Sequence, residues 1–178
     1  PGNRMSKATT HYQGRFLSLM EASHWEYVTR SNAHAVVVIV ALTSDDEIVL
    51  VEQYRRPVNR RVIELPAGLV GDQHGPDEQV LEAAHRELIE ETGYQAESVE
   101  LVMESPSSAG MTDEIISFIR ARGLKKIGSG GGDDSEDIVT HVVPLDQVNP
   151  WLRQKQADGH YLDPKIFTAL YWLSQESG

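Results

Sequence analysis

Hydrophobic positions along this chain fall into short, mostly β-branched runs that predict a sheet-rich protein. The two strongest runs, residues 35–42 and 47–54, flank the turn-forming residues 43–46, and we expect them to pair as a hairpin in the core. Residues 12–30 contain two shorter runs around a polar bend, which is typical of a small antiparallel hairpin ahead of the main body. Further strands are predicted at residues 61–65, 99–103, 114–119 and 138–143.

Signals for helices occur at three places. The first helix is predicted over residues 76–92, because Pro76 suits the first helical turn and Gly93 suits the left-handed position after the last one. Its first turn is acidic, which complements the positive end of the helix dipole. The other two predicted helices are residues 145–154 and residues 164–174, the latter with Asp163 as its N-cap.

Composition narrows the function before any motif is considered. The 178 residues include 27 Asp and Glu against 16 Lys and Arg, a formal net charge of −11, and no cysteine. The missing thiols exclude disulfides, iron–sulfur clusters and a thiolate nucleophile, and the acidic balance argues against a nucleic-acid partner bound by charge alone. The longest apolar run, residues 35–42, is too short to cross a bilayer, and no signal-peptide pattern is visible, so we expect a cytoplasmic protein without a membrane partner.

The first predicted helix concentrates negative charge. Residues 77–91 hold six acidic side chains and one arginine, a net charge of −5. At about 100° per residue, Glu87, Glu90 and Glu91 lie on one flank of the apolar stripe. Because like charges three and four residues apart repel, this cluster favours a divalent cation with oxygen ligands, Mg²⁺ or Mn²⁺. The alternative is a solvated acidic face with an ion pair between Glu82 and Arg86. The apolar stripe consists of Leu81, Ala84 and Leu88.

The wider sequence around this helix resembles the signature of the Nudix hydrolases. That box consists of Gly, five residues, Glu, seven residues and then Arg-Glu-aliphatic-x-Glu-Glu-x-Gly-aliphatic. Its second half matches fully, with Arg86, Glu87, Leu88, Glu90, Glu91, Gly93 and Tyr94 in place.

The first half of the box departs from the signature. If Gly68 is the opening glycine, residues 70–75 carry a four-residue insertion. If instead Glu78 is the upstream glutamate, its spacing to Arg86 holds, but Asp72 stands in the place of the glycine. We prefer the insertion, because loops absorb extra length more easily than helices do. This choice leaves the role of any upstream glutamate open.

Stretches on either side of the box are similar to one branch of that superfamily, the ADP-ribose and nucleotide-sugar pyrophosphatases. The stretches that carry this likeness are residues 52–57 (EQYRRP), 64–68 (ELPAG), 105–114 (SPSSAGMTDE) and 136–143. The resemblance implies an α+β fold, a Nudix-type α/β/α sandwich with a mixed sheet over residues 33–178. A small N-terminal antiparallel β region, residues 1–32, precedes it.

The resemblance also implies Mg²⁺-dependent hydrolysis of the diphosphate linkage of a nucleoside diphosphate sugar, with ADP-ribose giving AMP and ribose 5-phosphate as the leading case. Metal ions would neutralise phosphate oxygens and acidify the attacking water. Arg86 is expected to orient the glutamates rather than to touch the substrate. The implied metal ligands are the Ala67 carbonyl, Glu87, Glu90, Glu91 and Glu136.

Residues 128–137 (GSGGGDDSED) form a glycine-rich and then acidic stretch that is typical of a flexible loop. In the branch that this chain resembles, a late loop carries the general base, and the matching position is Asp134. Since aspartate is one methylene shorter than the usual glutamate, Asp133, Glu136 and Asp137 are alternatives. A loop that closes on the substrate fits the glycines, and an idle surface connection is the alternative.

Further residues are candidates for contact with the substrate. Arg55 and Arg56 can clamp a diphosphate. Glu114 can bind a sugar hydroxyl or orient a metal-bound water, and Trp25 or Tyr27 can stack on a nucleobase. Ordinary surface exposure or packing is the alternative for each. The resemblance further implies a homodimer in which residues 12–30 reach the partner's site. Rival functions are hydrolysis of another sugar nucleotide, such as GDP-mannose, and a sensor that binds nucleotide sugars without turnover.

Overall fold

The computed structural model describes residues 8–72, 75, 77–132 and 137–176. The helices are α1 (Val80–Thr92), α2 (Val148–Ala157) and α3 (Lys165–Glu176), with a short 3-10 helix η1 (Arg56–Val58). One sheet contains β4 (Ala35–Ala41), β7 (Ala67–Val70), β9 (Ser98–Pro106) and β10 (Ile115–Arg122). A second contains β5 (Glu47–Arg55), β6 (Arg60–Glu64), β12 (Ile138–Pro144) and β13 (Tyr161–Leu162). The remaining strands are β1 (Thr9–Gln13), β2 (Leu17–Ala22), β3 (Trp25–Arg30), β8 (Tyr94–Gln95) and β11 (Lys125–Lys126).

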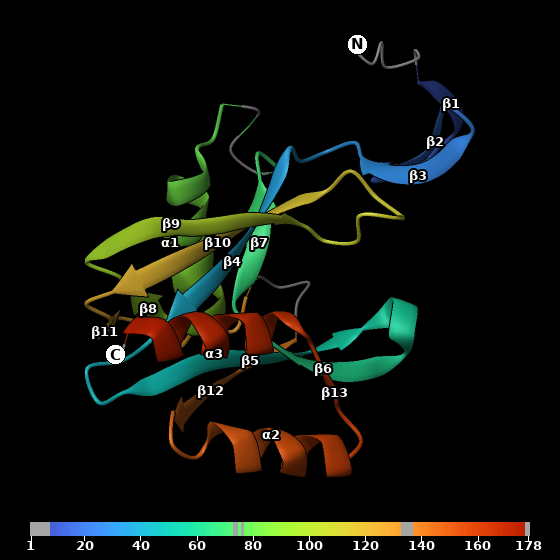
Figure 1. Ribbon diagram of the computed structural model, residues 1–178. Helices are drawn as coiled ribbons and strands as arrows, with labels where there is room; N and C mark the ends of the chain where they lie inside the picture. The colour runs from blue at the N-terminus through green and yellow to red at the C-terminus, as the bar shows by residue number, and fades with distance from the viewer. Residues whose placement is uncertain (1–7, 73–74, 76, 133–136, 177–178) are drawn as a thin grey trace.

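Two four-stranded sheets form the centre of the protein, and the helices cover them (Figure 1). The first sheet has the order β7-β4-β10-β9 and the second β12-β5-β6-β13. Both are mixed, because β10 runs parallel to β4 and β13 runs parallel to β6, whereas the other neighbours are antiparallel. None of the helices in the described part combines the length and the apolar character that a membrane crossing requires.

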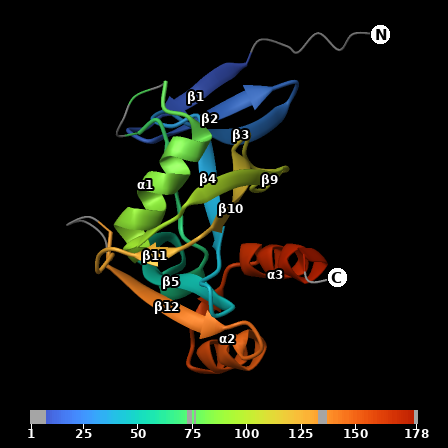
Figure 2. The same ribbon diagram turned by 90° about the vertical axis from the view of Figure 1, so that its left-hand side faces the viewer.

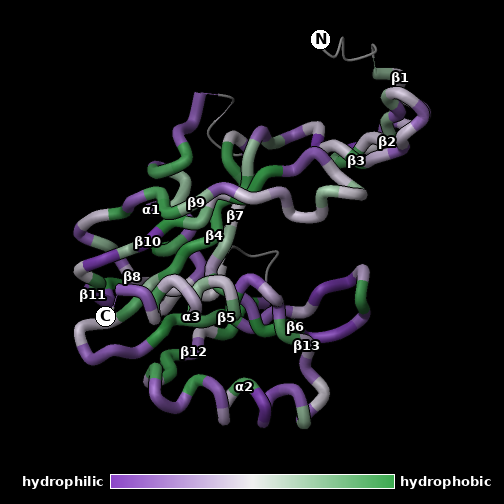
Figure 3. Tube along the Cα trace, in the orientation of Figure 1, coloured by the Kyte–Doolittle hydropathy of each residue, from purple (hydrophilic) through white to green (hydrophobic). Residues whose placement is uncertain are grey.

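Strand β4 is apolar on both faces because helices and strands pack on both sides of it. Val37 and Ile39 belong to a cluster with Ala84 and Leu88 of α1. Val38 belongs to a second cluster, which includes residues of β5, α2 and α3. The unbroken apolar run of β4 is therefore what a strand needs when it is covered on both faces. Figure 2 shows α1 and α3 on different sides of this sheet, and Figure 3 shows the hydrophobic course of β4 and β5.

The hairpin predicted from residues 35–42 and 47–54 is wrong. The two strands exist, but β4 pairs with β7 and β10, whereas β5 pairs with β6 and β12. A single bridge between Leu42 and Ile48 joins them in the described part. Because each strand finds partners for both of its edges in its own sheet, the turn at residues 43–46 carries the chain from one sheet to the other.

Helix α1 begins at Val80, four residues after the predicted start at Pro76, which lies outside the described residues. The backbone N–H of Gln79 donates to the carboxylate of Glu82 at 3.3 Å, so the helix starts with a capping contact of its own. Its end is as predicted, with Gly93 in the left-handed region at φ 69°. Leu81, expected in the apolar stripe, is 41% exposed, and the buried face instead includes Ala83, Ala84 and Leu88.

The remaining predicted elements are present with shifted ends. Helix α2 begins and ends three residues later than predicted. Helix α3 begins at Lys165, whose backbone N–H donates to the Asp163 carboxylate at 2.8 Å, as the predicted cap requires. The prediction missed the short strand β7, which places the first half of the box beside α1.

The N-terminal region forms a three-stranded antiparallel sheet, β1-β2-β3, rather than the two-stranded hairpin expected. Strands β2 and β3 pair around Ser23 and His24, both at positive φ. The sheet joins the body through β3, where the N–H of Val28 donates to the Met111 carbonyl at 2.8 Å. The division into residues 1–32 and 33–178 stays a prediction.

Candidate active site

The acidic face of α1 lies against β7, and Gly68 lets the two come close together. Glu87 is 8% exposed. A Cβ atom placed on Gly68 would lie 1.9 Å from the carboxyl carbon of Glu87. No larger residue fits at position 68 while Glu87 keeps its place, so this glycine is a steric requirement of the site.

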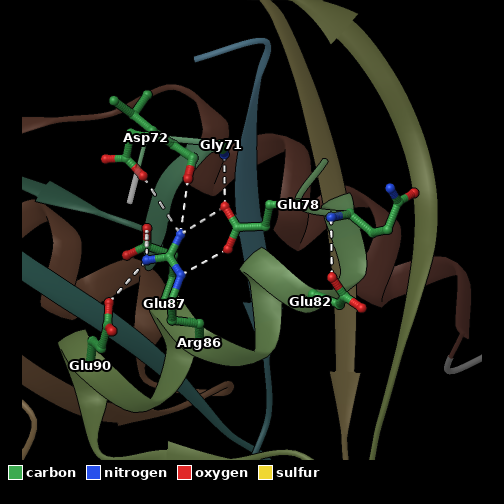
Figure 4. A network of polar contacts seen from close by, with 9 residues as sticks. Gly71, Asp72, Glu78, Glu82, Arg86, Glu87 and Glu90 are labelled. Atoms are coloured by element: carbon green, nitrogen blue, oxygen red, sulfur yellow. Dashed lines mark hydrogen bonds and ion pairs between the residues drawn. The ribbon is translucent and has the colours of Figure 1, made fainter. Parts of the chain in front are cut away.

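Arg86 is the centre of the polar network in Figure 4. Its Nη1 donates to Glu87 at 2.7 Å and to Glu90 at 3.0 Å. Its Nε donates to Glu78 at 3.0 Å, and its Nη2 donates to the carbonyl of Leu69 at 3.0 Å. These bonds occupy all three guanidinium nitrogens, so the geometry suits an arginine that orients carboxylates rather than one that binds the substrate.

Glu78 is the member of this network to which sequence reasoning assigned no role. It is 7% exposed, and besides Arg86 it accepts a hydrogen bond from the N–H of Gly71 at 2.7 Å. Burial acts to lower the pKa of Arg86, but the hydrogen bond with Glu78 and the charge of Glu87 raise it above its ordinary value, so Arg86 stays charged. The available signal was the seven-residue spacing between Glu78 and Arg86, which an insertion upstream of Glu78 leaves intact.

Glu91 and Glu90 complete the acidic face of α1. Glu91 is 2% exposed, and its Oε2 accepts a hydrogen bond from the backbone N–H of Ala67 at 3.0 Å. The side chain of Glu90 is 41% exposed and reaches Arg86. Ala67, expected to offer its carbonyl to a metal, thus lies directly beside Glu91.

Negative charge exceeds positive charge around Arg86. Asp72 Oδ1 lies 3.8 Å from Arg86 Nη2, in addition to the carboxylates of Glu78, Glu87 and Glu90. Burial raises the pKa of Glu87 to about 7, although the charge and hydrogen bond of Arg86 act to lower it. A buried carboxylate in this condition indicates a place where a further cation would be stabilised.

The carboxylates of this site do not converge on one position that a metal ion could occupy. Within the described residues, no group of three or more acidic or histidine side chains is placed so that it could hold a metal ion. The carboxylates of Glu87 and Glu90 are engaged by Arg86, and that of Glu91 by the Ala67 N–H. A metal ion would compete with these bonds.

A cavity of about 530 Å³, the carboxylate cavity, opens beside this network. Its volume suits a small-molecule ligand. The N-terminal region contributes to this cavity of its own chain, whereas residues 12–30 were expected to reach the site of a partner. The lining includes Glu87, Glu90 and Glu91 of α1, Gln53 and Arg55 of β5, and Phe16, Leu17 and Arg30 of the N-terminal region.

The two arginines predicted to clamp the substrate lie in neighbouring places. Arg55 lines the carboxylate cavity, and its Nε donates to Glu64 Oε2 at 2.7 Å. Burial raises the pKa of Glu64, against the hydrogen bond and charge of Arg55. Arg56 lines a second cavity that adjoins the first.

Glu114 and Trp25 are not among the residues that line the carboxylate cavity. Glu114 accepts a hydrogen bond from Arg30 Nε at 2.5 Å, and Trp25 donates to the carbonyl of Gly110 at 3.4 Å. Because Arg30 itself lines the cavity, it connects Glu114 to the site. The predicted substrate contacts of Glu114 and Trp25 stay predictions.

Residues 126–132, here called the glycine strap, are held on the C-terminal end of α1. The N–H groups of Gly131 and Gly132 donate to the carbonyls of Glu91 and Glu90. Gly130 has φ 70°, and a Cβ atom there would lie 2.4 Å from the carbonyl carbon of Thr92. In this part of the expected loop, the glycines allow close packing on the helix.

Of the acidic part of the expected loop, the structure describes only the last residue, Asp137. Asp133, Asp134 and Glu136, the candidates for the base and for a late metal ligand, lie outside the described residues. Asp137 is described, directly before β12, and forms an ion pair with Arg61.

Fold and site together define the class of this protein: an α+β domain in which one helix presents clustered carboxylates to a cavity. A family model described as NUDIX domain matches residues 32–163, and the chain belongs to the Nudix family. Its fold matches a structure titled "Crystal structure of ADP compounds hydrolase" with a TM-score of 0.74 and 21% identity, covering 96% of this chain and 91% of that one. The predicted Nudix-type fold is thereby confirmed.

Relatives by sequence carry two kinds of name. A "Methanol dehydrogenase activator" of Bacillus methanolicus is 37% identical over 77% of this chain and 70% of its own length. An "ADP-ribose pyrophosphatase" of Bacillus subtilis is 32% identical over 67% of this chain, and the match spans only 60% of that protein. Another of Escherichia coli K12 is 30% identical over 79% of this chain and 67% of its own length. These matches confirm the resemblance to the ADP-ribose pyrophosphatase branch.

Proposed function

We propose that this protein hydrolyses the diphosphate linkage of a nucleoside diphosphate sugar in a Mg²⁺-dependent reaction. ADP-ribose is the leading substrate, with AMP and ribose 5-phosphate as products. The observation that carries the proposal is the gathering of Glu87, Glu90 and Glu91 on the wall of a cavity of about 530 Å³. Relatives named ADP-ribose pyrophosphatase support the substrate class.

The donor set fits a divalent cation. Glu87, Glu90 and Glu91 offer carboxylate oxygens, which Mg²⁺ prefers, and burial has raised the pKa of Glu87 to about 7. A bound cation would supply charge to the phosphate oxygens and an activated water. The proposed ligands are these three glutamates, the Ala67 carbonyl and Glu136.

The other residues of the chain bind and orient. Arg86 fixes Glu87 and Glu90 by hydrogen bonds. The Nε of Arg55 donates a hydrogen bond to Glu64, and its two Nη atoms have no hydrogen-bond partner among the described residues. These Nη atoms are therefore available for charge-assisted bonds to the diphosphate. Asp134 is the proposed general base.

The nucleobase is assigned to the wall that the N-terminal sheet forms. Phe16 is 50% exposed and lines the carboxylate cavity, so its ring offers a surface on which a base can stack. Arg30 lies on the same wall and is bonded to Glu114, the proposed contact for a sugar hydroxyl. Trp25 does not line the cavity of its own chain, so its proposed contact with a nucleobase is in the cavity of the partner in a homodimer.

A homodimer is part of this proposal. The N-terminal sheet exposes large apolar side chains, including Tyr12 (68%), Leu19 (37%) and Trp25 (61%). A second copy of the chain that covers this sheet would remove them from water. Sedimentation equilibrium tests this directly: a monomer at all concentrations contradicts the dimer.

A second candidate function is action on a partner dehydrogenase. It is favoured by the 37% identity to a protein named methanol dehydrogenase activator. One assay tests this second candidate, because an activator changes the turnover of a methanol dehydrogenase when the two purified proteins are mixed. Unchanged turnover of the dehydrogenase contradicts the activator function.

The experiment that tests the main proposal is product analysis with ADP-ribose, ADP-glucose, GDP-mannose and UDP-glucose, with and without Mg²⁺. We expect metal-dependent release of AMP from ADP-ribose and its loss in Glu91→Gln. Cleavage of GDP-mannose instead would reassign the substrate. Binding of these compounds without any product would favour a sensor and contradict the hydrolase.

A further inference from the structure

The turn between β5 and β6 concentrates positive charge in an acidic chain. Four of the 16 Lys and Arg residues, Arg55, Arg56, Arg60 and Arg61, fall within seven positions. Figure 3 draws this turn largely in the colour of hydrophilic residues. The turn is held by other groups, since Asn59 adopts φ 51° and accepts a hydrogen bond from the hydroxyl of Tyr54. The density of arginines therefore calls for a different explanation.

A cavity of about 630 Å³, the arginine cavity, lies beside this turn. It shares Gln53 and Arg55 with the carboxylate cavity, so the two adjoin. Arg56, Arg61 and Asp137 also line it, so its lining holds three arginines and one acidic residue. Its volume is enough for a sugar phosphate.

The four arginines differ in their partners. Arg55 is paired with Glu64, and Arg60 lies over the Tyr161 ring, 4.9 Å from its centre, and does not line the arginine cavity. The guanidinium of Arg56 has neither an ion-pair nor a hydrogen-bond partner among the described residues, although it lines the cavity. Arg56 is therefore a cation that is free to bind a ligand.

Arg61 has one partner, Asp137, that a ligand in the cavity could replace. Its Nη2 pairs with Asp137, which is 70% exposed. Its Nη1 is buried and has no hydrogen-bond partner in the described part, although Glu52 Oε1 lies 3.4 Å away. An anion in the cavity can replace the exposed Asp137 as the partner of Arg61.

The position of the arginine cavity indicates which part of a substrate it meets. The carboxylate cavity is bounded by the N-terminal sheet on one side and by Gln53 and Arg55 where it joins the arginine cavity. In Figure 1 the N-terminal sheet lies above the β5–β6 turn, on the same side of the molecule. A substrate whose base contacts the N-terminal sheet would extend its sugar towards Arg56.

We propose that Arg56 and Arg61 form a subsite for a second phosphate group, carried by the sugar end of the substrate and separate from the diphosphate that is cleaved. Planar guanidinium groups bind phosphate by paired, charge-assisted hydrogen bonds. This assignment rests on the proposed function for the orientation of the substrate. The preferred substrate class is then a nucleoside diphosphate linked to a phosphorylated sugar.

The test compares two ligands that differ by one phosphate, glucose 1-phosphate and glucose 1,6-bisphosphate, in calorimetric titrations of the full chain with Mg²⁺. We expect the bisphosphate to bind about tenfold more tightly than the monophosphate. Arg56→Ala should bring this ratio close to one. Arg60→Ala is the matched control, because it removes the same charge from the same turn but not from the cavity, and it should keep the ratio.

Several results would overturn the subsite. Equal affinities of the unaltered protein for the two ligands exclude a second phosphate contact. The absence of bisphosphate binding at concentrations up to about 10 mM, which corresponds to very weak affinity, excludes it as well. If Arg60→Ala and Arg56→Ala lower the preference for the bisphosphate equally, the preference arises from the long-range electrostatic field of the turn and not from a specific site. A thermal unfolding scan of each variant checks that the fold is intact.

A further variant acts in the opposite direction. Asp137→Asn removes the carboxylate that competes for Arg61, so binding of the bisphosphate should become tighter. Weaker binding in this variant contradicts the model of competition. These titrations need no turnover: if no sugar nucleotide is hydrolysed but Arg56→Ala still abolishes the preference, the proposed function fails and the subsite stands.

Discussion

The backbone N–H of Gly131 donates a hydrogen bond to the carbonyl oxygen of Glu91 at 2.9 Å, which ties the glycine strap to the last turn of the acidic helix. The Lys126 ammonium reaches the next carbonyl, that of Thr92, at 2.6 Å. Helices leave their last carbonyls without internal partners, and here the strap supplies them. The strap thereby holds the part of α1 that carries Glu90 and Glu91.

The strap is expected to matter for turnover through its packing. In Gly130→Ala, the new methyl group would lie 2.4 Å from the Thr92 carbonyl carbon, at a backbone φ of 70° that alanine disfavours. We expect kcat for ADP-ribose to fall at least about tenfold, because the helix end must shift. Gly128→Ala is the control, since its Cβ would meet its nearest atom at 4.0 Å. Equal kcat values for the two variants contradict this role.

Glu78 should support activity without touching the substrate. In Glu78→Gln, Arg86 loses a charged partner at 3.0 Å and is freer to leave Glu87 and Glu90. We expect activity to fall about 10- to 100-fold, as for partners that orient metal ligands, with a higher Mg²⁺ requirement. Glu82→Gln changes an exposed carboxylate on the same helix and should leave both unchanged. An unaltered Mg²⁺ titration in Glu78→Gln would show that the pair is structural only.

Gly68 should tolerate no side chain. Gly68→Ala forces the Glu87 carboxylate away, because the added methyl group would overlap it. We expect kcat to fall about 100-fold, since small displacements of reacting groups have effects of this size. Gly110→Ala, where a Cβ meets nothing within 4 Å, is the control. Activity of Gly68→Ala within about twofold of the unaltered protein falsifies the steric requirement.

A carboxylate on the other face of β5 should control stability in acid. Burial acts to raise the pKa of Glu52, but hydrogen bonds from Lys155 and His141, with the charge of Lys155, lower it from 4.5 to about 2. A pKa lowered by folding stabilises the protein above the unfolded value, and this contribution is lost as the pH falls from about 4.5 to about 2.

Urea unfolding between pH 6 and pH 2, a range that brackets this titration, tests the contribution of Glu52. The difference in unfolding free energy between the unaltered protein and Glu52→Gln should be constant above about pH 5 and should narrow as the pH approaches 2. A difference that does not depend on pH in this range would mean that the Glu52 carboxylate is not preferentially charged in the folded protein.

The sequence by itself determined what depends on residues close together in the chain. The spacing of Glu87, Glu90 and Glu91 defined an acidic flank because a helix has a fixed period. The left-handed Gly93 and the cap at Asp163 follow from equally local preferences, and both are present. The Nudix signature lies in the same short segment, so the family was visible without any structure.

Only the tertiary structure decided which elements meet. The edges of a β-strand can pair with any other strand, so the runs at residues 35–42 and 47–54 could not reveal that each would join a different sheet. The same holds for Phe16 and Arg30, which reach the carboxylate cavity from the N-terminal region. The spacing of Glu78 to Arg86 was visible in the sequence, but only the structure shows that the two side chains are hydrogen-bonded. These contacts depend on the packing of the whole chain. A local pattern indicates which face of a segment is buried, but it does not indicate which other segment packs against that face.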